Sequence, residues 1–294
     1  MSAATGDDAW MASGSDIMRD AMQSRRITPN VLHLLPILDT LPPSAVVCEV
    51  GCGPGGITLD IAQRYPHLTV LGIDIDTKSI EQAQDAATKA NVTNLSYAAG
   101  DAVKLNEVAS LPGFEALNSG CDLVYSHAAI MHTSDQVESM RQMRLAAKPG
   151  GTVSLKEGDS GLFFAYPDIP GMKKMLEVFP RLGAAKGADT CLGRKLLSHA
   201  LAVGYTRDEV TLTDITAVTA SAPVARAGLA KGIGDIFANV GNKPALMEAT
   251  GVSAEDITFI RQGLEEWSNC PDGICSFPSL AIICVGKGIT DKEA

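Results

Sequence analysis

The stretch VVCEVGCGPGG, at residues 46–56, constrains the fold of this chain more than any other. Its first half is apolar and rich in valine, which is typical of a buried strand. Four glycines and a proline stand among the six residues that follow. Because glycine has no side chain and tolerates backbone conformations that other residues avoid, a ligand can approach such a turn closely. The stretch therefore predicts a buried strand that ends at a ligand-binding turn.

Strand-like and helix-like segments alternate along the chain after this turn. Apolar runs predict further strands at 69–75, 95–100, 121–128, 152–158, 207–218 and 279–288. Segments with helical periodicity lie between them, at 57–65, 77–90, 135–147 and 193–205. Strands that alternate with helices form parallel sheets with right-handed crossovers. The sequence therefore predicts an α/β fold, with a doubly wound, mostly parallel seven-stranded sheet.

Three segments do not fit this alternation. Residues 1–40 predict an N-terminal helical lid before the main domain, which we place at 41–294. Within that domain, two mainly helical insertions at about 159–190 and 221–270 do not suit the sheet. We expect them to form caps beside it.

Composition excludes several functional classes. The formal net charge is −10, and acidic residues outnumber basic ones by 34 to 24 without a Lys/Arg-rich tract. A nucleic-acid binder needs a basic face, so no nucleic-acid partner is expected. No apolar run approaches the ~20 residues of a membrane span, and the N-terminus lacks the apolar core of a signal peptide. The sequence thus predicts no membrane association.

Seven scattered cysteines suit a reducing compartment, so we expect a cytoplasmic protein. Cys270 and Cys275 could form a disulfide or half of a metal site. A second pair of ligands with zinc-like spacing does not accompany them, so no metal site is predicted.

The glycine turn matches two ligand-binding patterns. Gly51, Gly53 and Gly56 satisfy G-x-G-x-x-G, which is found in dinucleotide sites, whereas Gly51, Gly53 and Gly55 satisfy G-x-G-x-G. With Glu49 two residues before the first glycine, the segment resembles motif I of the class I S-adenosylmethionine-dependent methyltransferases. The resemblance implies a Rossmann-like methyltransferase fold and S-adenosyl-L-methionine as the cofactor. It also implies that the turn, including Cys52, lies under the cofactor and that Glu49 holds its methionine amino end.

Other landmarks of that family follow in order. Asp74 ends the second strand and is placed to accept the ribose hydroxyls, with Ile75 beside it. Asp101 and Ala102 match the positions that bind the adenine in the family. Ser126 lies in the segment that resembles the fourth strand, which passes the methionyl group. The KPGG turn after residue 147 resembles the turn that follows in the same family.

Segments outside these landmarks resemble a narrower group, the UbiE-like small-molecule methyltransferases, and among them the fungal enzymes that methylate gliotoxin-type thiols. In that group an arginine before motif I contacts the cofactor carboxylate, and Arg26 is the matching candidate, with Arg25 as the alternative. The chain departs from the group at two positions. Glu49 stands where aspartate is usual, and Trp10 is the aromatic residue available where tyrosine is common, as a lid over the substrate.

The resemblance implies a small-molecule acceptor, with a thiol, hydroxyl or amine as the methylated group. An alcohol would need a positioned base, whereas a thiol is partly ionised at neutral pH. His127, just beyond the fourth strand, is the candidate base. His132, Phe163 and Tyr166 are candidate substrate contacts, although helix capping for His132 and cap packing for the aromatic residues are alternatives. His33 lies away from the strand ends and is assigned no role.

Two other functions remain open from the sequence. An NAD-dependent enzyme would share the fold and Asp74, but Asp101 and the G-x-G-x-G pattern count against it. A non-catalytic S-adenosylmethionine-binding regulator would keep every cofactor landmark. The sequence also leaves open whether the protein is a homodimer.

Overall fold

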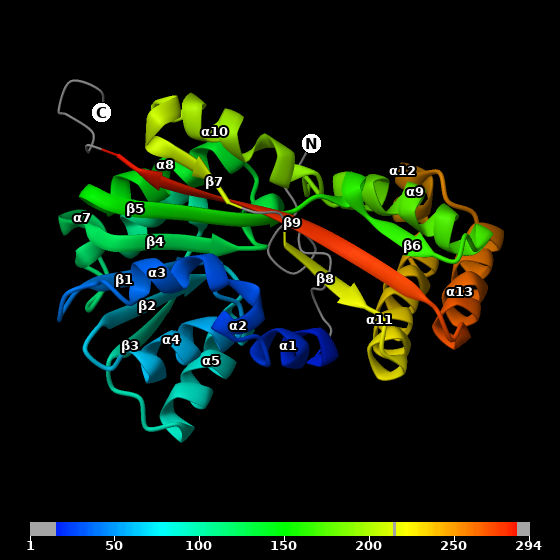
Figure 1. The fold of residues 1–294 in the computed structure, drawn as a ribbon, viewed down its shortest axis with the longest axis horizontal. Coiled ribbons are helices and arrows are strands. Elements are labelled where there is room, and N and C mark those ends of the chain that lie inside the picture. Colours follow the sequence, from blue (N-terminus) through cyan, green and yellow to red (C-terminus); the bar gives the residue numbers. More distant parts are fainter. Residues whose placement is uncertain (1–15, 214–215, 287–294) are drawn as a thin grey trace. The chain divides into compact units, whose positions relative to one another are not determined.

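A computed structural model describes residues 16–213 and 216–286 of the chain. The chain divides into two compact units (Figure 1). The larger unit comprises Gly14–Glu157, Arg194–Asp214 and Leu280–Ala294. The smaller unit contains the two inserted segments, Gly158–Gly193 and Ile215–Ser279. Among the described residues, no helix is long and apolar enough to cross a membrane.

The larger unit is built on a mostly parallel sheet. Its strands are β1 (Val46–Val50), β2 (Thr69–Asp74), β3 (Leu95–Ala99), β4 (Cys121–His127), β5 (Ala147–Gly158), β7 (Val210–Leu212) and the second half of β9 (Ile274–Val285). The described strands run in the order β3-β2-β1-β4-β5-β9, and β7 pairs with β9. The first five are parallel, and β7 is antiparallel to β9. The predicted doubly wound, mostly parallel α/β fold is confirmed, although the sheet of the described residues has nine strands rather than the predicted seven.

Helices pack on both faces of this sheet (Figure 1). Two of them, α4 (Gly56–Arg64) and α5 (Thr77–Lys89), contact β2, whereas α8 (Gln136–Ala146) contacts β4 and α10 (Leu196–Ala202). Asp76 caps α5 and Asp135 caps α8 by accepting backbone N–H bonds, as N-cap residues do. Two short helices, α6 (Leu105–Val108) and α7 (Ala116–Ser119), lie between β3 and β4.

The N-terminal segment covers one face of β1 and β4. It contains α1 (Asp16–Gln23), α2 (Ile27–Asn30) and α3 (Leu35–Leu38). Its fully buried Val31, Leu34 and Leu38 share one apolar cluster with Val47 of β1 and Leu123 of β4. Because the segment buries this much apolar surface, it is an integral part of the larger unit rather than a separate layer.

The smaller unit has its own apolar core. It contains β6 (Phe164–Tyr166), β8 (Thr216–Ala220), the first half of β9, α9 (Pro170–Ala185), α11 (Pro223–Gly241), α12 (Pro244–Thr250) and α13 (Ala254–Asn269). Both β6 and β8 are antiparallel to β9. Trp267 is fully buried in this core, and its indole Nε1–H donates to the carbonyls of Tyr166 and Ile274.

Several strand boundaries differ from the sequence prediction. β9 begins at Ile274, five residues before the predicted start at 279. The predicted strand 207–218 is a 3₁₀ turn (Arg207–Glu209) followed by two separate strands, β7 and β8. Thr206 and Glu209 form a capping box on that turn, and the extended backbone begins only after it, at Val210. β5 already begins at Ala147, so the KPGG segment is part of the strand. β6 was not predicted, because three residues give too short a pattern.

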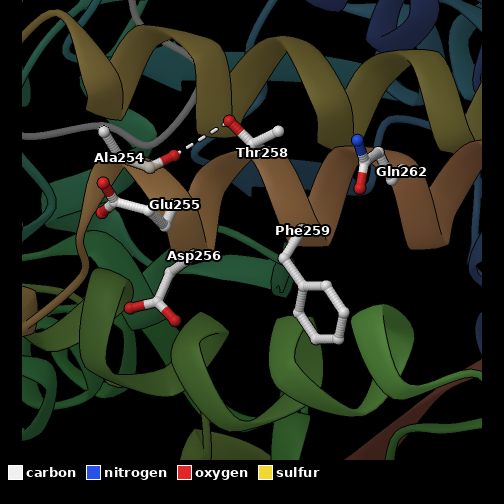
Figure 2. A pocket seen from close by; sticks show the side chains of 6 residues that line it. All are labelled: Ala254, Glu255, Asp256, Thr258, Phe259 and Gln262. Atoms are coloured by element: carbon white, nitrogen blue, oxygen red, sulfur yellow. Dashed lines mark hydrogen bonds between the residues drawn. The ribbon is translucent and has the colours of Figure 1, made fainter.

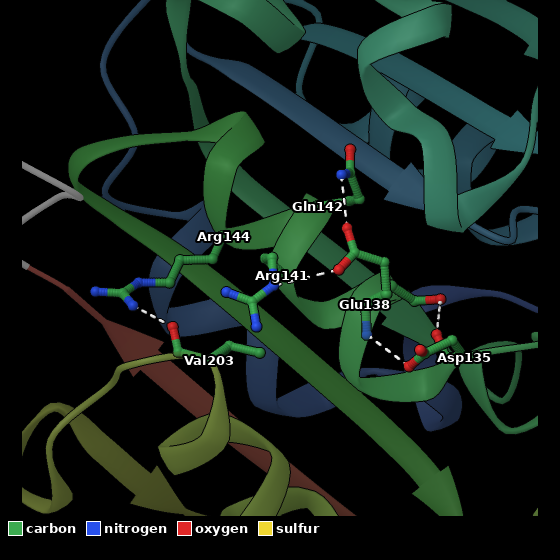
Figure 3. A network of polar contacts seen from close by, with 7 residues as sticks. Asp135, Glu138, Arg141, Gln142, Arg144 and Val203 are labelled. Carbon is green, nitrogen blue, oxygen red and sulfur yellow. Dashed lines mark hydrogen bonds and ion pairs between the residues drawn. The ribbon is translucent and has the colours of Figure 1, made fainter. Parts of the chain in front are cut away.

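A polar network joins α8 to the chain after α10 (Figure 3). Glu138 accepts hydrogen bonds from Arg141 and Gln142 on the exposed side of α8. On the other side, the Arg144 guanidinium donates to the Val203 carbonyl and lies 4.7 Å from the centre of the Tyr205 ring. Arg144 therefore ties the fold together where α8 and α10 meet.

Replacing a buried leucine of the N-terminal segment should destabilise the larger unit. Leu34 is fully buried, whereas Leu32 on the same segment is 44% exposed. We expect Leu34→Ala to lower the free energy of unfolding by about 2–5 kcal/mol, because it leaves a cavity in the shared apolar cluster. The control, Leu32→Ala, should cost less than about 1 kcal/mol. Urea unfolding followed by circular dichroism measures both, and equal losses would contradict the packing described.

Candidate functional site

The glycine turn after β1 combines a tight packing contact with an open position. Gly51 has a φ of +78°, and a Cβ there would lie 2.2 Å from the Cβ of Ala129. Gly53 also has a positive φ, of +54°, but a Cβ there would meet no atom within 4 Å. Gly55 immediately precedes α4. Gly51 is therefore required by packing against the chain, whereas the backbone at Gly53 faces open space.

Glu49 is buried at the end of β1 and joins three elements. Its Oε2 accepts hydrogen bonds from Thr58 Oγ1 of α4 at 2.5 Å and from Tyr125 Oη of β4 at 2.7 Å. Burial raises the pKa of Glu49 to about 7, against the opposing effect of the two hydroxyl donors. The carboxyl group thus changes its charge near neutral pH at the base of the glycine turn.

Asp74 links β2 to the same turn. Its Oδ2 accepts from the Gly53 N–H at 2.7 Å, and its Oδ1 accepts from the Asp76 N–H at 2.9 Å. Burial raises the pKa of Asp74, and the backbone donors act against this shift. Ile75, the next residue, is 57% exposed despite its apolar side chain. An exposed apolar side chain beside a half-buried carboxylate suits the two ends of a nucleoside, a flat ring and a diol.

Asp101 and Ala102 lie at the end of β3. Asp101 caps the 3₁₀ turn Ala102–Lys104 by accepting from the Val103 N–H through Oδ1. Both Asp101 and Ala102 are half-buried. Because β1, β2 and β3 are adjacent and parallel, the turns after all three strands open at the same edge of the sheet.

The two candidate arginines point differently. The Arg26 side chain is exposed, and its Nη1 donates to the carbonyls of Gln23 and Arg25, within its own segment. Arg25 is half-buried, and burial lowers its pKa while the charge of Glu49 opposes that shift. The charge of Arg25 also helps to lower the pKa of His127. Burial and charge therefore favour Arg25 over Arg26 as the arginine of the site.

Polar side chains form two rows across β1, β4 and β5. Residues that face each other across neighbouring strands are Glu49 and Tyr125, Tyr125 and Ser154, and His127 and Lys156. His33, from the N-terminal segment, contacts Ser154 Oγ through Nε2 at 3.1 Å. His33 was assigned no role from the sequence, and this contact places it against the middle of β5.

Burial leaves several polar atoms of this region without partners. Among the described residues, Ser126 Oγ, His127 Nδ1 and Glu157 Oε2 are buried and accept or donate no hydrogen bond. Burial, together with the charges of Arg25, Lys156 and His33, lowers the pKa of His127 well below its usual value. His127 is therefore neutral at pH 7, as a general base must be.

Glu157 holds the loop that follows β4. Its Oε1 accepts from the backbone N–H groups of Ala129 at 3.2 Å and Ile130 at 2.9 Å. Burial raises the pKa of Glu157 to about 8, because its side chain is fully enclosed. The carboxyl group is therefore largely protonated at neutral pH.

The remaining candidates lie elsewhere. His132 ends a 3₁₀ turn after β4 in the larger unit. Phe163 and Tyr166 belong to the smaller unit, where Phe163 packs edge-on against Phe277 with ring centres 4.5 Å apart. Tyr166 is 55% exposed on β6. Trp10 lies outside the described residues. The substrate contacts of His132, Phe163, Tyr166 and Trp10 stay predictions.

A hollow in the smaller unit is lined by none of these landmark residues. Figure 2 shows its lining, which comes from α13: Ala254, Glu255, Asp256, Thr258, Phe259 and Gln262. Asp256 is already engaged, in the capping box of this helix with Ser253 and in an ion pair with Lys174. The hollow brings together no group that suits methyl transfer.

Sequence reasoning missed three polar residues of the larger unit, which are His33, Lys156 and Glu157. The signal for two of them was present, because KEG interrupts an apolar strand at residues 156–158. Charged residues at the carboxyl end of a parallel strand are candidates for a site. His33 carried no such signal, since its contact with Ser154 spans 121 residues.

The comparison with known proteins identifies the family. A family model described as a methyltransferase domain matches residues 42–192 of the 294. The chain therefore belongs to the methyltransferase-domain family. The predicted class, an S-adenosylmethionine-dependent methyltransferase with a Rossmann-like fold, is confirmed.

Individual relatives are distant. The chain is 25% identical over 164 residues to an uncharacterised methyltransferase of Schizosaccharomyces pombe, an alignment that covers 56% of this chain and 58% of that protein. It is 25% identical over 225 residues to a trans-aconitate 2-methyltransferase of Deinococcus radiodurans, an alignment that covers 75% of this chain and 78% of that protein.

Among solved structures, a Haemonchus contortus phosphoethanolamine N-methyltransferase in complex with phosphomonomethylethanolamine and S-adenosylhomocysteine has a TM-score of 0.50 at 17% identity. The match covers 87% of this chain and 52% of that one. At this identity the likeness supports the fold.

Replacement of Glu157 should change how stability depends on pH. The folded-state pKa of about 8 lies above the value of about 4.3 for an unfolded glutamate. The unfolded chain therefore releases this proton at lower pH, and the folded state loses stability as pH rises through this window. We expect Glu157→Gln to gain stability relative to wild type by up to about 1.4 kcal/mol per pH unit between pH 5 and 8.

Urea unfolding at several pH values measures this difference. The exposed Glu81 on α5 offers a control, Glu81→Gln. A Glu157→Gln difference that stays constant across the range would show that Glu157 ionises as an ordinary surface carboxylate.

Proposed function

We propose that this chain transfers a methyl group from S-adenosylmethionine to a thiol, hydroxyl or amine of a small metabolite, in the manner of the UbiE-like and gliotoxin-type enzymes. The observation that carries the proposal is the open backbone at Gly53, bonded to the half-buried carboxylate of Asp74. The trans-aconitate methyltransferase among the relatives acts on a small molecule, which supports this acceptor class.

The residues present fit the parts of the cofactor. Asp74 would accept the ribose hydroxyls, since each of its oxygens keeps a lone pair beside the backbone bond that it already accepts. Ile75 would pack on the adenine, and Asp101 with the Ala102 N–H would bind its edge. Glu49, Cys52 and Ser126 would lie along the methionyl part, with Arg25 at its carboxylate.

The protein's contribution to the reaction is mainly alignment. When bound, the cofactor supplies an electrophilic methyl group on its sulfonium. Holding an acceptor in line with that group can supply roughly 7–11 kcal/mol of the barrier. His127, neutral at pH 7, would take the proton of a hydroxyl acceptor or orient the acceptor, and a thiolate would need no base.

Two alternatives remain to be distinguished from this proposal. Membership of the methyltransferase family argues against an NAD-dependent reaction. A non-catalytic regulator would bind the cofactor through the same landmarks but would transfer no methyl group. Binding and turnover therefore have to be measured separately.

Removal of the nucleoside contacts should abolish tight cofactor binding. We expect Asp74→Ala and Asp101→Ala each to weaken S-adenosylmethionine binding by at least about tenfold, because each removes a hydrogen-bonded charged partner. Isothermal titration calorimetry measures this, with Asp85→Ala on the exposed side of α5 as the control. Binding of NAD instead, or of neither cofactor, would contradict the proposal.

Arg25 and Arg26 provide a matched test of which arginine contacts the cofactor. Arg25→Gln should weaken S-adenosylmethionine binding by about tenfold or more, since Arg25 is half-buried and its charge acts on Glu49 and His127. Arg26→Gln should change it by less than about twofold, because the Arg26 guanidinium bonds its own segment. The same calorimetric titration decides between them, and the reverse order would restore Arg26 as the cofactor contact.

A further inference from the structure

Lys156 and His127 form an unusual buried pair at the ends of β5 and β4. The two residues face each other across the strands. The Lys156 side chain is enclosed, with 6% of the residue exposed, and its Nζ donates to the Asn30 carbonyl. Ser154, which lies two residues before Lys156 on β5, contacts His33. Lysine is rarely enclosed to this degree unless it is paired with an anion.

The hydrogen-bond donors of this pair exceed the acceptors around them. An ammonium group has three N–H donors, and the Asn30 carbonyl is the acceptor that Lys156 uses within the described residues. His127 Nδ1 is buried and has no partner in the same part of the chain. Buried polar groups in proteins are almost always hydrogen-bonded. The pair therefore lacks at least one acceptor.

The local charge also favours an anion. Burial lowers the pKa of Lys156 to about 8. After burial itself, the charges that lower the pKa of His127 all come from basic groups, namely Arg25, Lys156 and His33. An anion placed between Lys156 and His127 would offset each of these effects.

The Ser154 hydroxyl and the His33 imidazole, next to the pair, already have hydrogen-bond partners. Ser154 Oγ donates to the Ile282 carbonyl at 2.9 Å, so it accepts from His33 Nε2. Burial and the charge of Lys156 lower the pKa of His33 to about 4, and the ring is neutral at pH 7. His33 therefore positions β5 rather than binding the anion.

Glu49, on the same face of the sheet, also has hydrogen-bond partners. Glu49 lies on β1, and its Oε2 accepts from both Thr58 and Tyr125. Burial raises its pKa to about 7. Glu49 therefore does not act as the missing partner of Lys156.

We propose that Lys156 Nζ and His127 Nδ1 form a subsite for a carboxylate of the methyl acceptor, so that the acceptor is a small organic acid. The inference rests on the proposed function, because it names the acceptor class of that site. An ammonium N–H and an imidazole N–H can each donate to one oxygen of a carboxylate. His127 in its Nδ1–H tautomer donates to one oxygen, and Lys156 donates to the other.

Acetate is a suitable probe, because it carries the carboxylate and little else. Acetate is titrated into the full-length protein at pH 7 and constant ionic strength, with and without saturating S-adenosylhomocysteine. The NMR signals of the His127 ring, assigned with His127→Asn, report occupancy. We expect a saturable shift of these signals in both titrations, and chloride at the same concentrations should give none.

Variants of Lys156 show whether the charge binds the acetate. Lys156→Met should weaken acetate binding by at least about tenfold, and Lys156→Arg should recover most of it. Lys89→Met on α5, which removes an exposed charge, is the matched control. An S-adenosylhomocysteine affinity within about twofold of wild type shows that each variant is folded. If Lys156→Met does not fold, Lys156→Arg and Lys156→Gln carry the same comparison.

Several results would overturn the subsite. Absence of an acetate-dependent shift in a protein that binds S-adenosylhomocysteine would reject it while leaving the proposed function intact. Loss of the shift when S-adenosylhomocysteine is bound would assign the pair to the methionyl carboxylate of the cofactor instead. Failure of S-adenosylhomocysteine to bind would reject the proposed function, and the acceptor assignment with it.

Discussion

The buried carboxyl group of Glu49 is the interaction on which the rest of the site depends. Thr58 of α4 and Tyr125 of β4 both donate to it, so one group joins the strand before the glycine turn, the helix after it and the neighbouring strand. Replacing it with a shorter or apolar side chain would leave two buried hydroxyls without their acceptor. The position of the turn relative to β4 follows from this contact.

One face of the sheet combines stability with function. The apolar side chains of the N-terminal segment pack on Val47 and Leu123, and the polar rows lie further along the same strands, toward their carboxyl ends. Asn30 meets Lys156, and His33 meets Ser154, at the boundary between the two. The segment that completes the core thus also supplies partners to the site, so the two roles cannot be separated by deleting it.

The fold was predictable, and a cofactor site could be proposed, because both depend on local patterns. A strand, a glycine turn and a carboxylate at a strand end are each legible in a few consecutive residues, as at Glu49 and Asp74. Contacts between distant segments could not be predicted in this way. Whether His127 faces Lys156 depends on the register of β4 against β5. Arg25 and Arg26 are adjacent in sequence, and only the direction of each side chain separates them. The predicted strand 207–218 is wrong at its start, because a capping box formed by Thr206 and Glu209 holds that segment in a 3₁₀ turn.

A crystal structure of the protein with S-adenosylhomocysteine tests the central claim, that the turns after β1, β2 and β3 together with Arg25 form one cofactor site. The account predicts the methionyl part beside Gly53, the ribose hydroxyls on Asp74, the adenine between Ile75 and Asp101, and the methionyl carboxylate on Arg25. A nucleoside bound away from Asp74 and Asp101, or a carboxylate that leaves Arg25 uncontacted, would contradict it.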